Sequence, residues 1–373
     1  MEKFICKENM CTGCKACVDK CTKNAIYIKD ELDTFNAVID TNKCIECGAC
    51  YKVCPNNNLV ELKEQISWYQ GWAKLSEERE SSSSGGFAAT LSRSFIKNDG
   101  VVCSCAFENG DFKFKIAETE EEIEVFKGSK YVKSNPEGIY RKVRDYLLQK
   151  RKVLFIGLPC QVAAVKNFMG EKLWSNLYTV DLICHGTPSV KLLEKYLEQY
   201  DIKLNDVKKI AFRTKNSFNL KEDDKPIIDT RIQDRYTMTF LSSLNYTENC
   251  YSCRYATENR IGDITIGDSW GSELINEEIE KGISLILCQT KKGEEILKSL
   301  PFIYEKVDIL KARENNHQLR HPAQLPLKRE QFFREIKAGK KYDSIVAKIY
   351  PKACLKQEIK KILFKIRRGV QRI

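Results

Sequence analysis

The sequence predicts a mixed fold: an α+β module first, then an α/β body with a mixed, partly parallel sheet, and a C-terminal helix. Three observations support it. Cysteines separated by turn residues fill residues 1–58. From residue 152, short apolar runs alternate with helical patterns, which indicates βαβ units. The segment after Tyr350 repeats apolar residues at helical spacing.

Four segments follow from this pattern. Residues 1–60 form the cysteine-rich module, 61–150 the first part of the body, 151–335 its βαβ core, and 336–373 a basic tail. We expect strands at 152–157, 177–183, 207–213, 263–268 and 284–290, helices at 161–169 and 190–200, and a hairpin over 101–117. Residues 59–80 are expected to be a helical or irregular connector. The run from Ser81 to Gly86 is either a linker or a turn that opens a helix.

Composition and charge restrict the function. No signal peptide and no membrane-spanning apolar stretch is visible, so we expect a cytoplasmic protein. In a reducing cytosol, the 17 cysteines favour metal ligation over disulfides. The net charge is +11, and residues 337–373 carry twelve Lys/Arg against two acidic residues. The near-neutral body argues against nucleic-acid binding.

Two cysteine quartets share one spacing. Cys11, Cys14, Cys17 and Cys21 are separated by two, two and three residues, and so are Cys44, Cys47, Cys50 and Cys54. This is the two-cluster ferredoxin pattern, in which the fourth cysteine of each run binds the other cluster. We expect one 4Fe-4S cluster on Cys11, Cys14, Cys17 and Cys54, and another on Cys44, Cys47, Cys50 and Cys21. The alternative is two zinc sites, but zinc ribbons use pairs of C-x-x-C rather than this spacing. Thr22 stands where the pattern usually has proline.

Four cysteines in the body form a less obvious set. Cys160 and Cys184 follow two neighbouring predicted parallel strands, at the edge where ligands bind in such sheets. Cys250 and Cys253 form a C-x-x-C before another strand. Four thiolates suffice for a third cubane. The alternative is two buried cysteines plus a small redox or zinc pair. The other five cysteines are interpreted as structural.

Several longer stretches resemble the coenzyme F420 hydrogenase/dehydrogenase beta-subunit family. They are SSGGFAATL, GSKYVKS, GLPCQVAAVK, DLICHGTPS and CYSCRYATENRIGDITIGDSWG, in that order between residues 83 and 271. The resemblance implies an iron–sulfur flavoprotein with FAD, and it favours the third 4Fe-4S cluster. By motif it implies FAD contacts from Ser84, Gly85, Gly86, Ser129, Lys130, Tyr131 and Ser134. The Gly-Gly turn before a helix is also a plausible anion cradle.

Two side chains are candidate catalytic residues. His185 follows Cys184 and is a candidate proton-transfer group, or it bonds a carbonyl in its turn. Asp268, in GDSWG with Trp270, lines the substrate pocket or builds the turn. His317 and His321 are assigned no role.

The basic tail places Leu355, Ile359, Ile362, Leu363, Ile366 and Val370 on one face of a helix. Such a helix can lie on an anionic membrane surface, at the inner face of the membrane. The alternative is a terminal helix that packs on the body with its basic face in solvent.

The sequence leaves three functions open. The first is an FAD- and 4Fe-4S-dependent oxidoreductase that passes electrons between a redox partner, or a small-molecule donor, and a substrate. The resemblance suggests the deazaflavin coenzyme or another small molecule, including one used in surface-polysaccharide synthesis. The second is an electron-transfer subunit without its own substrate, and the third is a scaffold with structural clusters.

Overall fold

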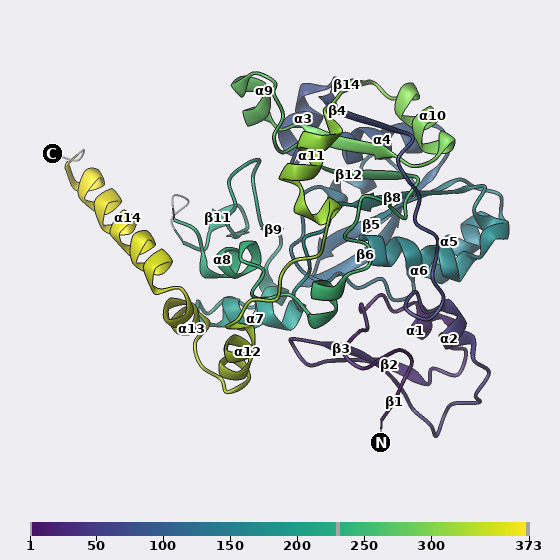
Figure 1. Ribbon diagram of the computed structural model, residues 1–373, viewed down its shortest axis with the longest axis horizontal. Helices are drawn as coiled ribbons and strands as arrows, with labels where there is room; N and C mark the ends of the chain where they lie inside the picture. Colours follow the sequence, from purple (N-terminus) through teal and green to yellow (C-terminus); the bar gives the residue numbers. More distant parts are fainter. Residues whose placement is uncertain (1, 229–231, 371–373) are drawn as a thin grey trace.

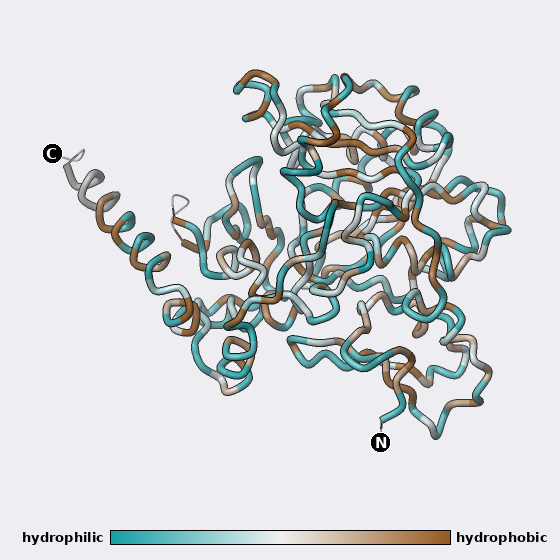
Figure 2. Tube along the Cα trace, in the orientation of Figure 1, coloured by the Kyte–Doolittle hydropathy of each residue, from teal (hydrophilic) through white to brown (hydrophobic). Residues whose placement is uncertain are grey.

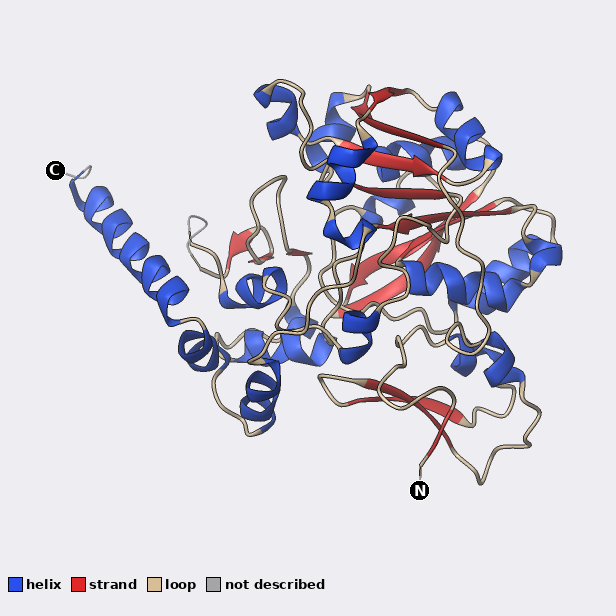
Figure 3. Cartoon of the chain, in the orientation of Figure 1, coloured by secondary structure: helices blue, strands red, loops and turns tan. Residues whose placement is uncertain are grey.

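The protein is described from a computed structural model, which defines the backbone of residues 2–228 and 232–370 and the side chains of these ranges up to residue 363. Figure 1 shows a small N-terminal module against one side of a larger α/β body, and a C-terminal helix that extends away from both. Figure 3 shows the twisted central sheet of the body with helices on both of its faces.

The N-terminal module contains one short helix in each cysteine run. Helix α1 (Ala16–Lys20) carries Cys17 and ends before Cys21, and helix α2 (Ala49–Val53) carries Cys50 and ends before Cys54. Each helix is preceded by a residue in the left-handed region, Lys15 with φ 57° and Gly48 with φ 70°. A small antiparallel sheet completes the module in the order β1 (Lys3–Phe4), β3 (Phe35–Ile39), β2 (Ile26–Asp30).

The body contains an eight-stranded mixed sheet in the order β14-β4-β13-β12-β8-β7-β5-β6. Its strands are β4 (Ser67–Ala73), β5 (Val101–Glu108), β6 (Asp111–Ala117), β7 (Val153–Gly157), β8 (Leu177–Leu182), β12 (Ile264–Asp268), β13 (Ser284–Cys288) and β14 (Phe302–Lys306). The four central strands β5, β7, β8 and β12 are parallel, and the outer strands join antiparallel. This confirms the predicted partly parallel sheet and the hairpin.

Alternate side chains of the central strands face two hydrophobic layers. Val153 and Phe155 of β7 pack toward α5 (Ile139–Leu148), α6 (Pro159–Met169) and the cysteine-rich module. Leu154 and Ile156 pack on the opposite face, toward α4 (Phe87–Lys97) and α10 (Lys291–Ser299). This period of two is the geometry of a strand buried on both faces.

A helical subdomain extends the sheet at one end. Helices α7 (Val190–Glu198), α8 (Arg235–Leu241), α12 (Arg329–Lys337) and α13 (Tyr342–Ile349) share one core. Helix α14 (Pro351–Val370) follows and projects from it (Figure 1). The remaining elements are α3 (Ser76–Ser81), α9 (Asn276–Lys281), α11 (Ile309–Asn315) and a small sheet of β9 (Ile210–Ala211), β10 (Lys221–Glu222) and β11 (Lys225–Pro226).

Three expectations about the body are corrected by the structure. Residues 59–80 are only in part the expected helical or irregular connector, because β4 lies inside the main sheet between β13 and β14, while 59–66 are mostly irregular and α3 is helical. Gly71 permits this close pairing, since a Cβ there would lie 2.1 Å from the carbonyl oxygen of Ile303. The predicted strand 207–213 is reduced to Ile210–Ala211 in the small sheet. Ser81 ends α3 and residues 82–86 form a turn that opens α4, so the linker interpretation is also wrong.

Candidate functional site

The first group of thiols lies at the base of the cysteine-rich module, beside the body. Cys11, Cys14, Cys17 and Cys54 are all buried. Burial raises the pKa of Cys17, and the neighbouring Cys14 raises it further. The pKa of Cys54 is raised by the Cys6 thiol, by burial and by Cys14. Cys54 of the second quartet is therefore near Cys14 of the first quartet.

The second group is nearer the surface. Cys47 is exposed, and Cys21, Cys44 and Cys50 are half-buried. Burial raises the pKa of Cys50, with further contributions from Cys44 and Cys21. The thiol of Cys21 thus lies among cysteines of the other quartet. Among the side chains that the structure describes, no three His, Cys, Asp or Glu residues form a group that could hold one metal ion.

The four body cysteines come together from three separate segments. Cys160 begins α6 directly after β7, and Cys184 follows β8. Cys250 lies in a short 3₁₀ helix (Glu248–Ser252) and Cys253 directly follows it. Burial raises the pKa of Cys184, and then Cys250 and Cys160 raise it. Burial, Cys250 and Cys160 likewise raise the pKa of Cys253 to about 12.

A buried lysine lies among these thiols. The Lys133 side chain belongs to the loop before α5, and its Nζ is 3.8 Å from Cys160 Sγ. Burial opposes its charge, but the thiols of Cys160, Cys250, Cys184 and Cys14 raise the pKa of Lys133 above its ordinary value. Because Cys14 belongs to the first group, the first and body groups are neighbours.

A cavity of about 550 Å³ adjoins the body cysteines. Its walls come from the turn before α4, the loop 127–134, and the carboxyl ends of β7, β8 and β12. Of the residues predicted to contact a flavin, the lining includes Ser84, Gly86, Ser129, Lys130, Tyr131 and Ser134, and of the other predicted site residues it includes Cys184, His185 and Asp268. Residues separated by almost two hundred positions thus share one wall.

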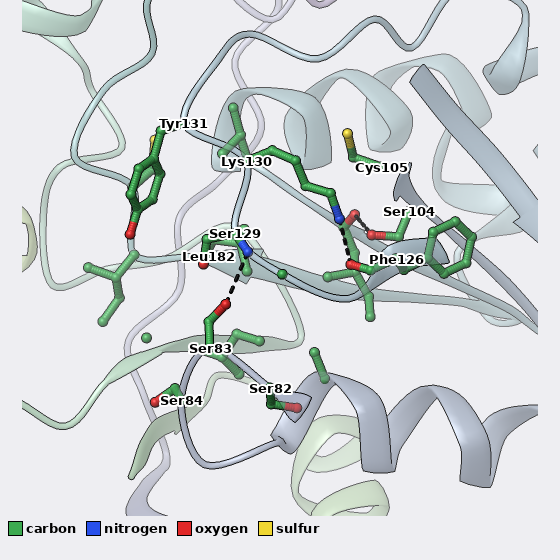
Figure 4. A pocket seen from close by; sticks show the side chains of 18 of the residues that line it. Ser82, Ser83, Ser84, Ser104, Cys105, Phe126, Ser129, Lys130, Tyr131 and Leu182 are labelled. Atoms are coloured by element: carbon green, nitrogen blue, oxygen red, sulfur yellow. Dashed lines mark hydrogen bonds between the residues drawn. The ribbon is translucent and has the colours of Figure 1, made fainter. Parts of the chain in front are cut away.

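Hydrogen bonds hold the two loops of the cavity together (Figure 4). The Ser129 N–H donates to Ser83 Oγ at 3.0 Å, which joins the loop to the turn. Lys130 Nζ donates to the carbonyl of Phe126 at 2.7 Å. Burial lowers the pKa of Lys130 to about 8. The loops are therefore preformed, and Lys130 supplies a cation at neutral pH.

Two glycines of the turn have different tasks. Gly86 has φ +90° and begins α4 without a side-chain cap, and Phe87, Ala88 and Ala89 of the first turn also line the cavity. The uncapped N–H groups of a first helical turn favour an anion. Gly85 is absent from the lining. Its carbonyl accepts from the Ala73 N–H at 2.8 Å, and a Cβ on it would lie 2.3 Å from the Gly71 carbonyl oxygen.

His185 faces the cavity and is held from behind by Gln318. Gln318 Nε2 lies 2.5 Å from His185 Nδ1 and 3.0 Å from His317 Nε2. With the amide donating, the His185 proton resides on Nε2. Burial, and then His317, lower the pKa of His185 to about 4. The ring is thus neutral at pH 7, and its partner is a side-chain amide rather than the turn carbonyl considered from the sequence.

Asp268 is paired with Arg213, which the sequence did not single out. The guanidinium donates to both carboxylate oxygens, at 2.6 and 3.1 Å, and also to the Ser83 carbonyl at 2.9 Å. Arg213 therefore ties the end of β12 to the turn before α4. No local spacing indicates this pair, because the two residues are 55 positions apart. Gln318 and Lys133 were missed for the same reason.

Comparisons with known proteins agree with this organisation. Residues 150–302 match the family model for the C terminus of the coenzyme F420 hydrogenase/dehydrogenase beta subunit, and residues 10–58 match the model for the 4Fe-4S dicluster domain. The F subunit of the F420H2 dehydrogenase of Methanosarcina mazei is 20% identical over 339 residues, covering 84% of this chain and 92% of the relative. An uncharacterized protein of Methanocaldococcus jannaschii is 23% identical, covering 80% and 88%.

Of two further matches, one is to a short segment and the other is to a solved structure. The B subunit of an ion-translocating oxidoreductase complex of Methanosarcina acetivorans is 39% identical over 61 residues, covering 16% of this chain and 21% of the relative. A chain from the solved F420-reducing NiFe hydrogenase complex of Methanosarcina barkeri is 20% identical, with a TM-score of 0.48, covering 75% of this chain and 94% of that one.

Proposed function

Because this chain belongs to the coenzyme F420 hydrogenase/dehydrogenase beta-subunit family and begins with a 4Fe-4S dicluster domain, we propose that it is an iron–sulfur flavoprotein oxidoreductase. It passes electrons between an outside redox partner and a substrate at a bound FAD. One observation carries the proposal. The cavity lined by the predicted flavin residues has Cys184 in its wall, and Cys184 belongs to the thiol group that adjoins the dicluster module.

The two N-terminal groups suit two clusters. We assign one cluster to Cys11, Cys14, Cys17 and Cys54, and the other to Cys21, Cys44, Cys47 and Cys50. The proximity of Cys54 to Cys14, and of Cys21 to Cys50, supports this crossed assignment. A cluster of four irons is larger than one ion, so its ligands stand further apart than those of a single zinc.

The body group suits a third cluster. Its four cysteines, Cys160, Cys184, Cys250 and Cys253, surround one buried region. Lys133 supports an anionic occupant there, because its ammonium is buried beside Cys160 and has no carboxylate partner among the described ion pairs. A buried ammonium without an anion is costly.

FAD fits the cavity by volume and by chemistry. About 550 Å³ is within the range of ligand pockets. The uncapped first turn of α4 and the Lys130 ammonium provide the donors that a diphosphate needs. When bound, a flavin exchanges two-electron chemistry with a substrate for single electrons. Gly85 contributes by holding the turn on β4.

Of the three thiol groups, the second one is nearest the protein surface. Cys47 is exposed, and so are the neighbouring Ile45 and Tyr51. We place contact with the redox partner there, because the first group is buried between this surface and the body. The dehydrogenase relative is itself named as one subunit, which supports a protein as that partner.

At the cavity, His185 and Asp268 have separate tasks. Neutral His185 presents Nε2–H and can hold that proton in a hydrogen bond to a bound substrate. Asp268 holds Arg213, which keeps a cation on the wall. The substrate we propose to test first is the deazaflavin coenzyme, because the dehydrogenase relative is named for it.

The test uses full-length protein purified without oxygen. We expect about twelve iron atoms per chain, since three cubanes are assigned, and FAD released on denaturation. About eight irons and no flavin after incubation with FAD would instead favour an electron-transfer subunit without its own substrate. Zinc without visible absorbance would overturn the cluster assignment altogether. Reoxidation of the reduced protein is then followed with the deazaflavin coenzyme and other small acceptors.

We further propose that the C-terminal tail contacts an anionic membrane surface. None of the helices in the described part of the chain is both long and apolar enough to cross a membrane. In α14, however, Leu355, Ile359, Ile362 and Leu363 are 62, 49, 57 and 54% exposed. Figure 2 shows hydrophobic and hydrophilic positions alternating along this helix. The side chains of Ile366 and Val370 lie outside the described ones.

A further inference from the structure

We propose that Lys133 sets the reduction potential of the cluster assigned to Cys160, Cys184, Cys250 and Cys253, by holding a positive charge between that cluster and the dicluster module. The inference rests on the proposed function, since it requires that third cluster. Lys133 is not a ligand in this proposal. It acts through the field of its ammonium on the group that the cysteines bind.

The backbone fixes Lys133 between the two modules. Its N–H donates to the Pro188 carbonyl at 2.9 Å, just after the segment that carries Cys184. Its aliphatic stem packs on the loop of the first quartet: a Cβ placed on Gly13 would lie 3.6 Å from Lys133 Cγ. Gly13 has φ +65°, a conformation that favours glycine. The stem therefore contacts the module while the ammonium reaches the body cysteines.

The surroundings of the ammonium are unusual for a lysine. The residue is 6% exposed. Within the described side chains, the hydrogen-bond partner of Nζ is Cys160 Sγ at 3.8 Å, and no ion pair with a carboxylate involves Lys133. Cys184, Cys250 and Cys14 also lie within its electrostatic reach. A lysine so buried and unpaired is destabilising unless an anion occupies the site.

A thiolate-bound cluster supplies that anion, and its charge becomes more negative by one on reduction. A fixed cation at this distance in a dry environment favours the reduced form, because charge interactions are stronger where water is excluded. Nearby charge and hydrogen bonds to sulfur are established determinants of cluster potential. Lys133 therefore makes this cluster easier to reduce than the same four thiolates would without it.

The sequence provides a matched control in Lys166. This lysine is also buried, but its Nζ donates to the Ile261 carbonyl at 2.5 Å, and its electrostatic neighbours are Asp263, Lys63, Asp181 and Lys292 rather than thiols. Lys166→Met therefore removes a buried ammonium without removing charge from the thiol group. It separates an electrostatic effect of Lys133 from the general cost of losing a buried lysine.

The experiment is an anaerobic redox titration of the full-length protein followed by electron paramagnetic resonance. The signal of the third cluster is assigned as the one that Cys160→Ser removes. In Lys133→Met we expect that signal to titrate at a more negative potential, with a smaller shift in the same direction for the cluster assigned to Cys14, which also lies within reach of the ammonium, and with the iron content unchanged. Lys133→Arg keeps the charge, so its midpoint potential should lie close to that of the wild type. Lys166→Met should leave the midpoint unchanged.

Other results would overturn the inference. An unchanged midpoint in Lys133→Met with full iron content contradicts a tuning role, while the third cluster stands. Selective loss of that cluster in both Lys133→Met and Lys133→Gln shows a role in assembly instead. If Lys133→Met does not fold, Lys133→Gln is titrated in its place. If Cys160→Ser removes neither iron nor a signal, the third cluster itself is refuted, which is a failure of the proposed function.

Discussion

The hydroxyl of Tyr140 in α5 donates a hydrogen bond of 2.7 Å to the main-chain carbonyl of Cys14 in the first quartet. Beside it, the Asp19 carboxylate accepts from the Gly138 N–H at 2.7 Å and from the Tyr140 N–H at 3.2 Å. The N-terminus of α5 is thus capped by the cysteine-rich module. These contacts fix the module on the body at the point where its thiols approach Cys160.

The first prediction concerns this contact. Tyr140 is fully buried, so Tyr140→Phe leaves the Cys14 carbonyl without its partner and should lower the free energy of unfolding by about 1 kcal/mol. Chemical denaturation of the anaerobic protein measures it. The control is Tyr51→Phe, because Tyr51 is exposed and should show no change. Equal stability of the two variants would contradict the contact.

The crossed ligand assignment predicts the result of combining cysteine substitutions. Cys54→Ala and Cys11→Ala each remove a ligand of the same cluster, so each variant and the double variant should lose about four irons. Cys54→Ala with Cys44→Ala affects two clusters and should lose about eight. Iron analysis after anaerobic purification distinguishes them. Additive loss in the Cys11 and Cys54 pair would show that each quartet binds its own cluster.

Lys130 predicts a pH dependence of FAD binding. The pKa of Lys130 is lowered to about 8, so its cation is present at pH 7 and is lost as the pH rises through that value. The dissociation constant of FAD should therefore increase above about pH 8. Lys130→Met should weaken binding about tenfold at pH 7, since a charge-assisted hydrogen bond is lost, and should abolish this dependence.

Lys127→Met is the control for that titration. Lys127 also lines the cavity, but it pairs with Glu124 at 2.6 Å. Flavin fluorescence quenching on apoprotein gives the constants over the pH range. The assignment of Lys130 to the flavin is wrong if its variant keeps the pH dependence of the wild type.

For His185 we predict a loss of turnover without a loss of cofactor. His185→Asn keeps an acceptor toward Gln318 but removes the Nε2–H donor, and reoxidation by the substrate should slow by about a hundredfold. Since the pKa of His185 is about 4, the wild-type rate should show no inflection from this group near its ordinary value of 6.5. Stopped-flow measurements of the reduced protein test both points. Wild-type turnover in His185→Asn would leave the residue a structural role only.

The tail prediction depends on where the helix leaves the core. Cys354 is buried against α13, so a truncation that begins at residue 355 preserves that packing. We expect the truncated protein to lose binding to vesicles that contain anionic lipid and to keep its iron content. The full chain should bind neutral vesicles weakly, because the contact is partly electrostatic. Unchanged sedimentation with anionic vesicles after truncation would exclude the helix as an anchor.

Local patterns were sufficient for much of this protein. Cysteine spacing predicted the dicluster module, since its cysteines lie on tight loops, and apolar periodicity predicted the hairpin and the strands that precede Cys160 and Cys184. Strand β4 was missed, because SWYQGWA is short and becomes a strand by pairing with residues more than two hundred positions away. The strand predicted at 207–213 is reduced to Ile210–Ala211, which pairs with Lys221 and Glu222 in a small separate sheet.

The sequence by itself predicted which residues bind clusters and which turns approach a phosphate, because both predictions depend on spacing within a few residues. Only the tertiary structure decided that Cys250 and Cys253 lie with Cys160 and Cys184, that Arg213 pairs with Asp268, and that Lys133 lies between two thiol groups. The physical reason is that the burial of a residue and the charges around it depend on which residues lie near it in space. Those neighbours are brought together by sheet pairing and by the packing of the module on α5.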